Sequence, residues 1–109
     1  MLQFHNNDCV SHMQSMSDDS VTMTLTDIPY DVVNNYDCGI REYNKGNADV
    51  LTFDLAKFIE EVVRVTKGSI YVFCSTEQVS TIRAGFVSKG LSTRLCIWEK
   101  TNPAPVHGD

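Results

Sequence analysis

Hydrophobic positions follow two different periods along the first thirty residues, and the change of period marks the predicted elements. Residues 2–6 are predicted to form a short strand. Val10, Met13 and Met16 then recur at near-helical spacing, which predicts a helix of about two turns over 9–16, with Asp8 at its N-cap. Over residues 21–26, Val, Met and Leu alternate with Thr, a pattern that predicts a β-strand.

The second half of the chain carries a stronger helical period. Asp54 stands where an N-cap belongs, and the helix is predicted to run to about Lys67, with Gly68 as its C′ glycine. Its apolar face is formed by Leu55, Phe58, Ile59 and Val62. Residues 69–74 are almost all apolar, which is typical of a parallel strand buried on both faces.

A capping-box pattern opens the last predicted helix. Ser75 takes the cap position and Gln78 the third helical position, and the helix is predicted to end at Gly90. Residues 94–100 are predicted to form a final strand in which Trp98 belongs to the core. The remaining residues, 101–109, contain two prolines and are predicted to be a loop.

Strands alternate with helices along the whole chain, which predicts an α/β fold with a largely parallel sheet. The one long interruption begins after the second predicted strand, where residues 27–49 have no period and are rich in Asn, Asp, Gly and Tyr. Within it we expect a mobile loop over 31–53, because long loops in compact domains are usually functional. Ligands of parallel α/β sheets bind beyond the carboxyl ends of the strands, so these ends are the places to search for a site.

Composition places the chain among single globular domains. It has 109 residues, of which 42% are hydrophobic and 21% charged, so intrinsic disorder is excluded. No apolar run approaches 18 residues, and the N-terminus has no signal-peptide pattern, so neither a membrane span nor a leader is expected. The four cysteines are widely spaced and form no CxxC pair, which favours reduced thiols, no metal site and a cytoplasmic location.

The net charge of −5 is unevenly distributed. Residues 1–54 hold two basic and nine acidic residues, whereas residues 55–109 hold seven basic and five acidic ones. No basic stripe is present, so the chain alone is expected to bind a phosphate backbone poorly.

The end of the second predicted strand carries the candidate chemistry. The chain there reads Asp27-Ile28-Pro29-Tyr30. Pro29 fixes its own φ and favours an extended Ile28, so a carboxylate, a main-chain carbonyl and an aromatic ring are presented together. Taken alone, these four residues favour an ordinary strand-to-loop turn, with Asp27 accepting backbone N–H groups.

In the context of the whole chain, this tetrapeptide resembles the (D/N/S)PP(Y/F/W) motif of the β-type amino-methyltransferases of DNA, the N6-adenine/N4-cytosine family. Further pieces match the family in order and spacing over nearly all residues. They are Asn7-Asp8-Cys9, Arg64-Val65-Thr66-Lys67-Gly68, the strand at 69–73, and Ile97–Lys100 followed by Asn102-Pro103. The resemblance implies a partial Rossmann-like methyltransferase fold, and residues 1–109 would be its N-terminal catalytic part.

The resemblance also implies roles for the motif residues. Asp27 and the carbonyl of Ile28 would accept hydrogen bonds from the exocyclic amine of a flipped adenine, and Tyr30 would stack on that base. Pro29 would keep the motif rigid, although Ile28 stands where the family has a first proline. Asp rather than Ser at the start of the motif favours adenine N6 over cytosine N4.

S-adenosylmethionine is the cofactor that the resemblance implies. Asp8 would lie near its adenine and Lys100 would face the site, although an N-cap and a solvated strand-end lysine are equally good interpretations. The family's Gly-rich FxGxG loop and its target-recognition region do not occur in this sequence. We therefore expect an inactive half of a methyltransferase, which self-associates or binds a partner chain that supplies the missing half.

Other interpretations stay open. The chain fits a phage or plasmid restriction-modification enzyme that methylates DNA in the cytoplasm of a bacterial or phage-infected cell. It also fits a non-catalytic remnant that acts as a binding or assembly partner, or a related enzyme that methylates RNA or a protein glutamine.

Overall fold

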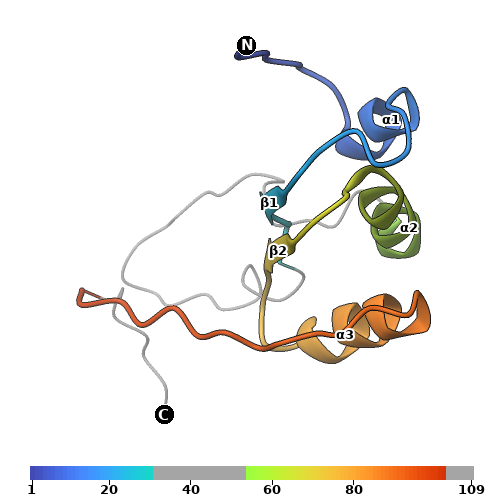
Figure 1. Cartoon of the computed structure of the whole chain (residues 1–109). Coiled ribbons are helices and arrows are strands. Elements are labelled where there is room, and N and C mark those ends of the chain that lie inside the picture. The colour runs from blue at the N-terminus through green and yellow to red at the C-terminus, as the bar shows by residue number, and fades with distance from the viewer. Residues whose placement is uncertain (31–53, 103–109) are drawn as a thin grey trace.

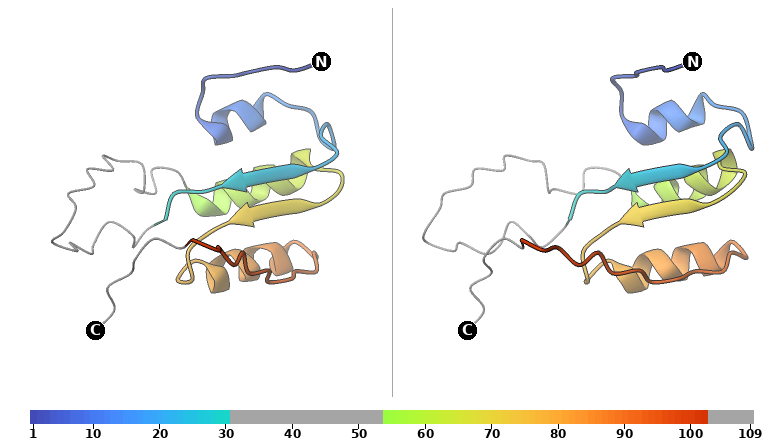
Figure 2. Two further views of the ribbon diagram at one scale, coloured as in Figure 1. Left: turned by 90° about the vertical axis from the view of Figure 1, so that its left-hand side faces the viewer. Right: turned by 60° about the vertical axis from the view of Figure 1, so that its left-hand side comes forward.

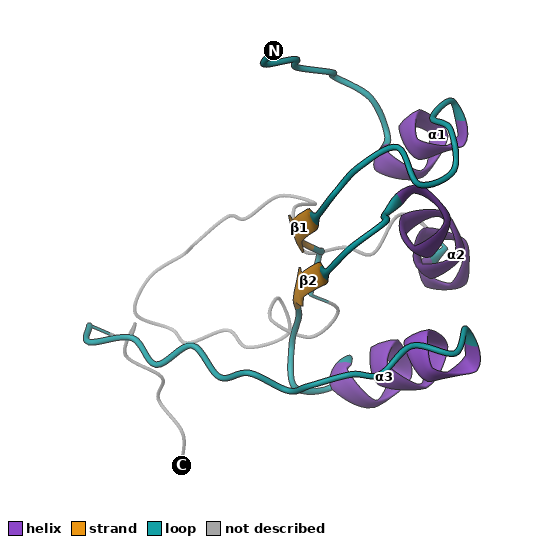
Figure 3. Ribbon diagram, viewed as in Figure 1, coloured by secondary structure: helices purple, strands orange, loops and turns teal. Residues whose placement is uncertain are grey.

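Two parallel strands and three helices are formed by residues 1–30 and 54–102, the parts of the chain that this computed structural model describes (Figures 1 and 3). The elements are α1 (Cys9–Gln14), β1 (Thr24–Asp27), α2 (Leu55–Val65), β2 (Ile70–Phe73) and α3 (Val79–Ser88). The protein is therefore a small α/β domain with helices flanking a two-stranded parallel sheet, which confirms the predicted fold class at this level.

The parallel ladder extends beyond the two strands at both ends. Thr24 pairs with Ile70 and Asp27 with Phe73. Before β1, Val21 forms a bridge with Thr66, and its N–H donates a 3.0 Å hydrogen bond to the Val65 carbonyl. After β1, the N–H of Ile28 donates to the Phe73 carbonyl over 3.3 Å. The chain is thus held in register up to the first residue after β1.

All three helices lie on one face of the sheet, with α2 between α1 and α3 (Figures 1 and 2). The buried core lies between this helical layer and the inner face of the sheet. Its buried members are Val10, Ile28, Phe58, Ile59, Val62, Ile82 and Phe86. Ile70 and Val72 pack against them from β2, as alternation along a strand requires.

The opposite face of the sheet carries apolar side chains that the described residues leave exposed. Leu25, Tyr71 and Phe73 alternate with the inward positions of the two strands, and Met23 precedes them on the same side. We call these four residues the open face. It contradicts the prediction that residues 69–74 are buried on both faces, because the described chain provides no second layer of helices.

Local capping follows the sequence closely. The Asp8 carboxylate accepts from the Ser11 N–H at 2.9 Å, and the Asp54 carboxylate accepts from the Ala56 N–H at 2.9 Å. Gly90 has φ +81°, the left-handed conformation expected just after a helix. Gly68 has another role than the predicted C′ glycine, because α2 ends at Val65. A Cβ at Gly68 would collide with the Thr22 carbonyl, so glycine permits a close backbone approach there.

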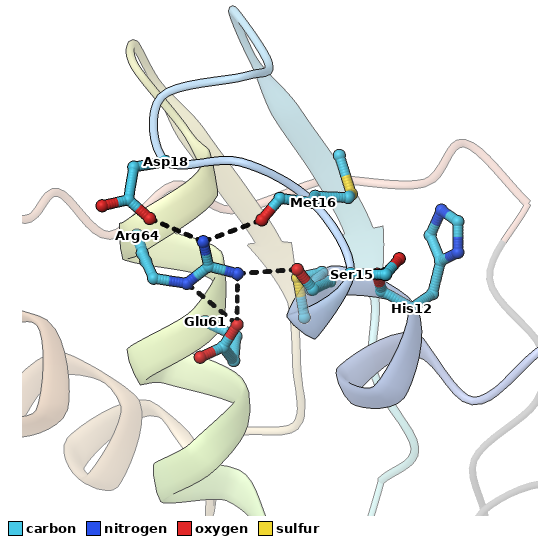
Figure 4. A network of polar contacts seen from close by, with 7 residues as sticks. His12, Ser15, Met16, Asp18, Glu61 and Arg64 are labelled. Atoms are coloured by element: carbon cyan, nitrogen blue, oxygen red, sulfur yellow. Dashed lines mark hydrogen bonds and ion pairs between the residues drawn. The ribbon is translucent and has the colours of Figure 1, made fainter.

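Arg64 of α2 binds the end of α1 and the turn that follows it (Figure 4). Its guanidinium donates to the main-chain carbonyls of Met13 and Met16, and it forms ion pairs with Asp18 and Glu61. The hydrogen bonds to Glu61 and then Asp18 raise the Arg64 pKa above its ordinary value. The end of α1 and the turn after it are thereby fixed to α2.

Two predicted strands are wrong. Residues 2–6 and 94–100 have no regular structure, and most of their side chains are exposed. A strand needs a hydrogen-bonded neighbour, and within the described residues the sheet contains only β1 and β2. Trp98 is 72% exposed and therefore lies outside the core, although its ring packs at 5.9 Å from that of Phe73.

Two further predictions concern the long loop and membrane-spanning segments. The mobile loop predicted for 31–53 lies outside the described residues. Among the helices of the described ranges, none has the length and apolar character needed to cross a membrane.

Candidate functional site

The carboxyl end of β1 is built on a residue that is itself part of the core. Asp27 is the last residue of the strand and its side chain points to the exposed face. Ile28 follows it, is only 4% exposed, and packs among the helices while its N–H extends the ladder to Phe73. Burial of the Ile28 side chain thus fixes the positions of the Asp27 carboxylate and the Ile28 carbonyl at the end of the sheet.

Tyr30 returns toward the strand end. Its hydroxyl donates a 2.7 Å hydrogen bond to Oδ1 of Asp27, and its side chain is half-buried. The second carboxylate oxygen of Asp27 and the carbonyl of Ile28 receive no hydrogen bond from residues 1–30 or 54–102. The Asp27 carboxylate and the Tyr30 side chain therefore lie in contact at one strand end, with the Ile28 carbonyl between them in sequence.

Gln78 is a member of this site that the sequence analysis placed only in a capping box. It is 4% exposed, and its Nε2 donates a 2.9 Å hydrogen bond to the Pro29 carbonyl. Its Oε1 accepts from the Ser75 N–H at 3.0 Å, which is one half of the predicted box. The other half is absent, because the Ser75 hydroxyl is buried and has no partner among the described residues, and α3 begins only at Val79. No local pattern indicates the contact between Gln78 and Pro29.

The end of β2 brings two titratable groups to the same region. Burial raises the pKa of the Cys74 thiol above its ordinary value. Hydrogen bonding to its own backbone N–H lowers the pKa of the Glu77 carboxyl. Cys74 is therefore a protonated thiol packed against the core at neutral pH, rather than a reactive thiolate.

The two residues proposed to bind the cofactor, Asp8 and Lys100, lie in other segments of the chain. Asp8 caps α1, and Lys100 lies exposed in the irregular segment after α3. The first part of that segment runs beside α3 and its last part extends away from α3, whereas α1 lies on the other side of α2 (Figures 1 and 2). Within the described residues, neither Asp8 nor Lys100 forms a hydrogen bond or an ion pair with residues 27–30.

No metal centre is formed by the described ranges, in which no three His, Cys, Asp or Glu side chains gather around one point. The rings of His5 and His12 stack with centroids 4.2 Å apart, without a third ligand. Cys9, Cys74 and Cys96 are free thiols. Burial, and then the Asp8 carboxylate, raise the pKa of Cys9.

No family model, curated protein or solved structure matches this chain. The candidate site is therefore defined by its own geometry, namely the group of residues 27–30 and Gln78 at the carboxyl ends of two parallel strands.

Proposed function

We propose that this chain binds an unstacked nucleobase by its exocyclic amine, as the base-binding part of an S-adenosylmethionine-dependent DNA amino-methyltransferase. The observation that carries the proposal is the group at the end of β1, in which the Tyr30 hydroxyl donates to the Asp27 carboxylate and the buried Ile28 lies between these two residues in sequence. In this proposal the two parallel strands and their helices are one part of a larger Rossmann-like sheet, and ligands of such sheets bind at this edge.

The chemistry of an exocyclic amine fits these groups. Its lone pair is delocalised into the ring, so the nitrogen is planar and a poor nucleophile. Two acceptors that bind both of its hydrogens favour a pyramidal nitrogen and stabilise the positive charge that develops when it attacks. Asp27 and Ile28 supply these acceptors, and Tyr30 stacks on the base. Adenine N6 is the preferred target and cytosine N4 the alternative.

The described residues do not fit a complete cofactor site. S-adenosylmethionine would supply the methyl group, and Asp8 is the residue proposed to lie near its adenosine. However, one Asp8 oxygen already caps α1, and no Gly-rich loop occurs in the sequence. We therefore propose no methyl-transfer step for this chain alone and assign it to binding and orienting the base.

The open face supports a second candidate function, that of an assembly partner. Parallel sheets are normally covered on both faces, and here Met23, Leu25, Tyr71 and Phe73 face outward. β1 and β2 also have no further neighbour within the described residues, and open strand edges tend to pair with other chains. A second copy, or a partner chain that carries a Gly-rich loop, would complete the sheet in the cytoplasm of a bacterial or phage-infected cell.

The base-binding proposal is tested with labelled hairpin oligonucleotides that hold one base outside the stem. Fluorescence anisotropy at low salt compares adenine with N6,N6-dimethyladenine, which has no amine hydrogens. We expect the wild-type chain to prefer adenine and Asp27→Ala to lose that preference. Glu60→Ala, on the exposed side of α2, is the matched control. Equal affinity of the wild type for the two bases would contradict the proposal.

The half-enzyme interpretation is tested separately. The purified chain is mixed with S-adenosylmethionine and duplex DNA, methylated bases are measured by mass spectrometry, and light scattering gives the mass in solution. We expect no methyl transfer, together with self-association through the open face that Leu25→Lys reduces. Methyl transfer by a monomer would show that no second half is needed.

A further inference from the structure

Gln78 connects two parts of the candidate site that are far apart in sequence. It lies 49 positions after Pro29, and its side chain spans from the Pro29 carbonyl to the Ser75 N–H. Both ends of the amide are used, Nε2 as a donor at 2.9 Å and Oε1 as an acceptor at 3.0 Å. The opposite orientation of the amide would place an oxygen against the Pro29 carbonyl, so this network fixes the orientation.

Helix capping explains only part of this arrangement. α3 begins at Val79, and the Gln78 side chain makes no capping hydrogen bond to that helix. The bond to the Ser75 N–H closes the turn before the helix, and it requires Oε1 alone. The Nε2 donor, buried and pointed at Pro29, is not needed for that turn. The hydrogen bond from Nε2 instead holds the segment after β1 in place.

The position of the Ile28 carbonyl follows from two anchors on either side of it. On one side, the Ile28 N–H donates to the Phe73 carbonyl. On the other side, the next carbonyl in the chain, that of Pro29, accepts from Gln78. The Ile28 carbonyl lies between these fixed groups. Without a proline at position 28, its direction depends on these two hydrogen bonds rather than on a ring.

We propose that Gln78 is a positioning residue that directs the Ile28 carbonyl toward the base by holding the Pro29 carbonyl against the end of β2. The inference rests on the base-binding function proposed above, and it adds a group that never touches the base. In this proposal the buried Gln78 amide gives residues 28–29 the rigidity that a proline at position 28 would otherwise provide. A change at Gln78 should therefore weaken the binding of bases that donate a hydrogen bond to the Ile28 carbonyl.

The test compares Gln78→Glu with Gln14→Glu, the same change at an exposed position of α1. Glutamate keeps the acceptor for Ser75 but, when ionised, cannot donate to Pro29. We expect the ¹³C resonance of the Pro29 carbonyl to shift once the introduced carboxyl is ionised and to return toward its wild-type position on acidification, where the carboxyl regains a donor. Burial raises the pKa of this carboxyl above that of free glutamate, so the resonance is followed over a titration from about pH 9 to about pH 4. Gln14→Glu should leave this resonance unchanged.

The second readout is the affinity for the hairpin with an extruded adenine. We expect Gln78→Glu to weaken it about three- to tenfold at a pH where the introduced carboxyl is ionised, the effect of one lost hydrogen bond, and to reduce the preference over dimethyladenine. Gln78→Met, of similar length and without an amide, should do the same at all pH values. It also replaces the Glu variant if that variant does not fold, as judged by amide dispersion.

Two results would overturn the proposal. An unchanged Pro29 resonance in a folded variant would show that Gln78 does not hold this carbonyl. A shifted resonance with wild-type preference for adenine would show that holding it does not direct the Ile28 carbonyl. If instead the wild-type chain shows no preference for adenine, the base-binding function fails. The Pro29 resonance then still decides whether Gln78 fixes the turn.

Discussion

The hydroxyl of Tyr30 donates a hydrogen bond to the carboxylate of Asp27, three positions earlier, at 2.7 Å. The contact ties an aromatic ring to the acid at the strand end and occupies one of its two oxygens. For a base that stacks on the Tyr30 ring, this contact would fix the distance between the plane of the base and the remaining Asp27 oxygen. In the proposed function, the hydroxyl sets where the ring lies and the ring face binds the base.

Tyr30→Phe and Tyr30→Ala separate these two roles. We expect Tyr30→Phe to bind the hairpin with an extruded adenine within about threefold of wild type, because stacking contributes about 1–3 kcal/mol per base and the ring remains. Tyr30→Ala should weaken binding by about tenfold or more. Anisotropy titration measures both, with Tyr71→Ala on the open face as the control. Equal loss in the Phe and Ala variants would assign the binding to the hydroxyl.

Ile28→Pro introduces a second proline before Pro29, as in the motif that residues 27–30 resemble, and is expected to destabilise this protein. Proline has no N–H, so the bond to the Phe73 carbonyl is lost, and a buried side chain is replaced by a smaller one. We expect a loss of about 1–3 kcal/mol in the free energy of unfolding, measured in urea.

Ile28→Val is the control for that experiment, because it keeps the N–H and removes only one methylene, at a cost of about 0.5–1.5 kcal/mol. A proline variant as stable as the valine variant would show that the ladder bond at position 28 contributes nothing.

Arg64→Ala should release α1 and the turn after it. The variant loses two carbonyl contacts and two ion pairs together, so the amides of residues 9–19 should exchange faster with solvent and the melting temperature should fall. Arg83→Ala, at an exposed position of α3, should leave both unchanged. Hydrogen exchange followed by mass spectrometry localises the effect. Unchanged exchange over residues 9–19 would mean that apolar packing alone holds α1.

The Cys74 thiol should react slowly with alkylating reagents. Burial raises its pKa, so at pH 8 it holds less thiolate than a free thiol such as N-acetylcysteine. The same shift makes the fold less stable as pH rises through the ordinary thiol pKa, because the unfolded chain loses the proton first. Iodoacetamide rates measured on a variant with Cys74 as its single cysteine check this. A rate equal to that of the free thiol would contradict it.

Sequence pattern predicted the parts of the fold that depend on local chemistry. The caps at Asp8 and Asp54, the stop at Gly90 and the helical face of α2 all follow from neighbours within one turn. The strand at 94–100 failed because pairing depends on a distant partner that apolar residues cannot specify. The same limit applies to Trp98, whose exposure depends on what covers the sheet.

The candidate site divides in the same way. Asp27, Ile28, Pro29 and Tyr30 are adjacent in sequence, and their grouping at the strand end was predictable from the strand pattern and the proline. Gln78 was not, because its contact with Pro29 exists only once β1 and β2 lie side by side. Asp8 and Lys100 remain predictions about a cofactor, since nothing in the described chain joins them to the strand end.

The order in which the two strands enter the sheet has a consequence for folding. β2 follows α2 directly, whereas β1 meets this unit across long sequence separations, such as the 42 positions between the bonded hydroxyls of Thr24 and Thr66. Local contacts of low closure entropy form first, so α2, β2 and α3 are expected to assemble as a nucleus onto which β1 docks. The base-binding group, made by that docking, would then be the last part of the molecule to acquire its shape and the first to lose it.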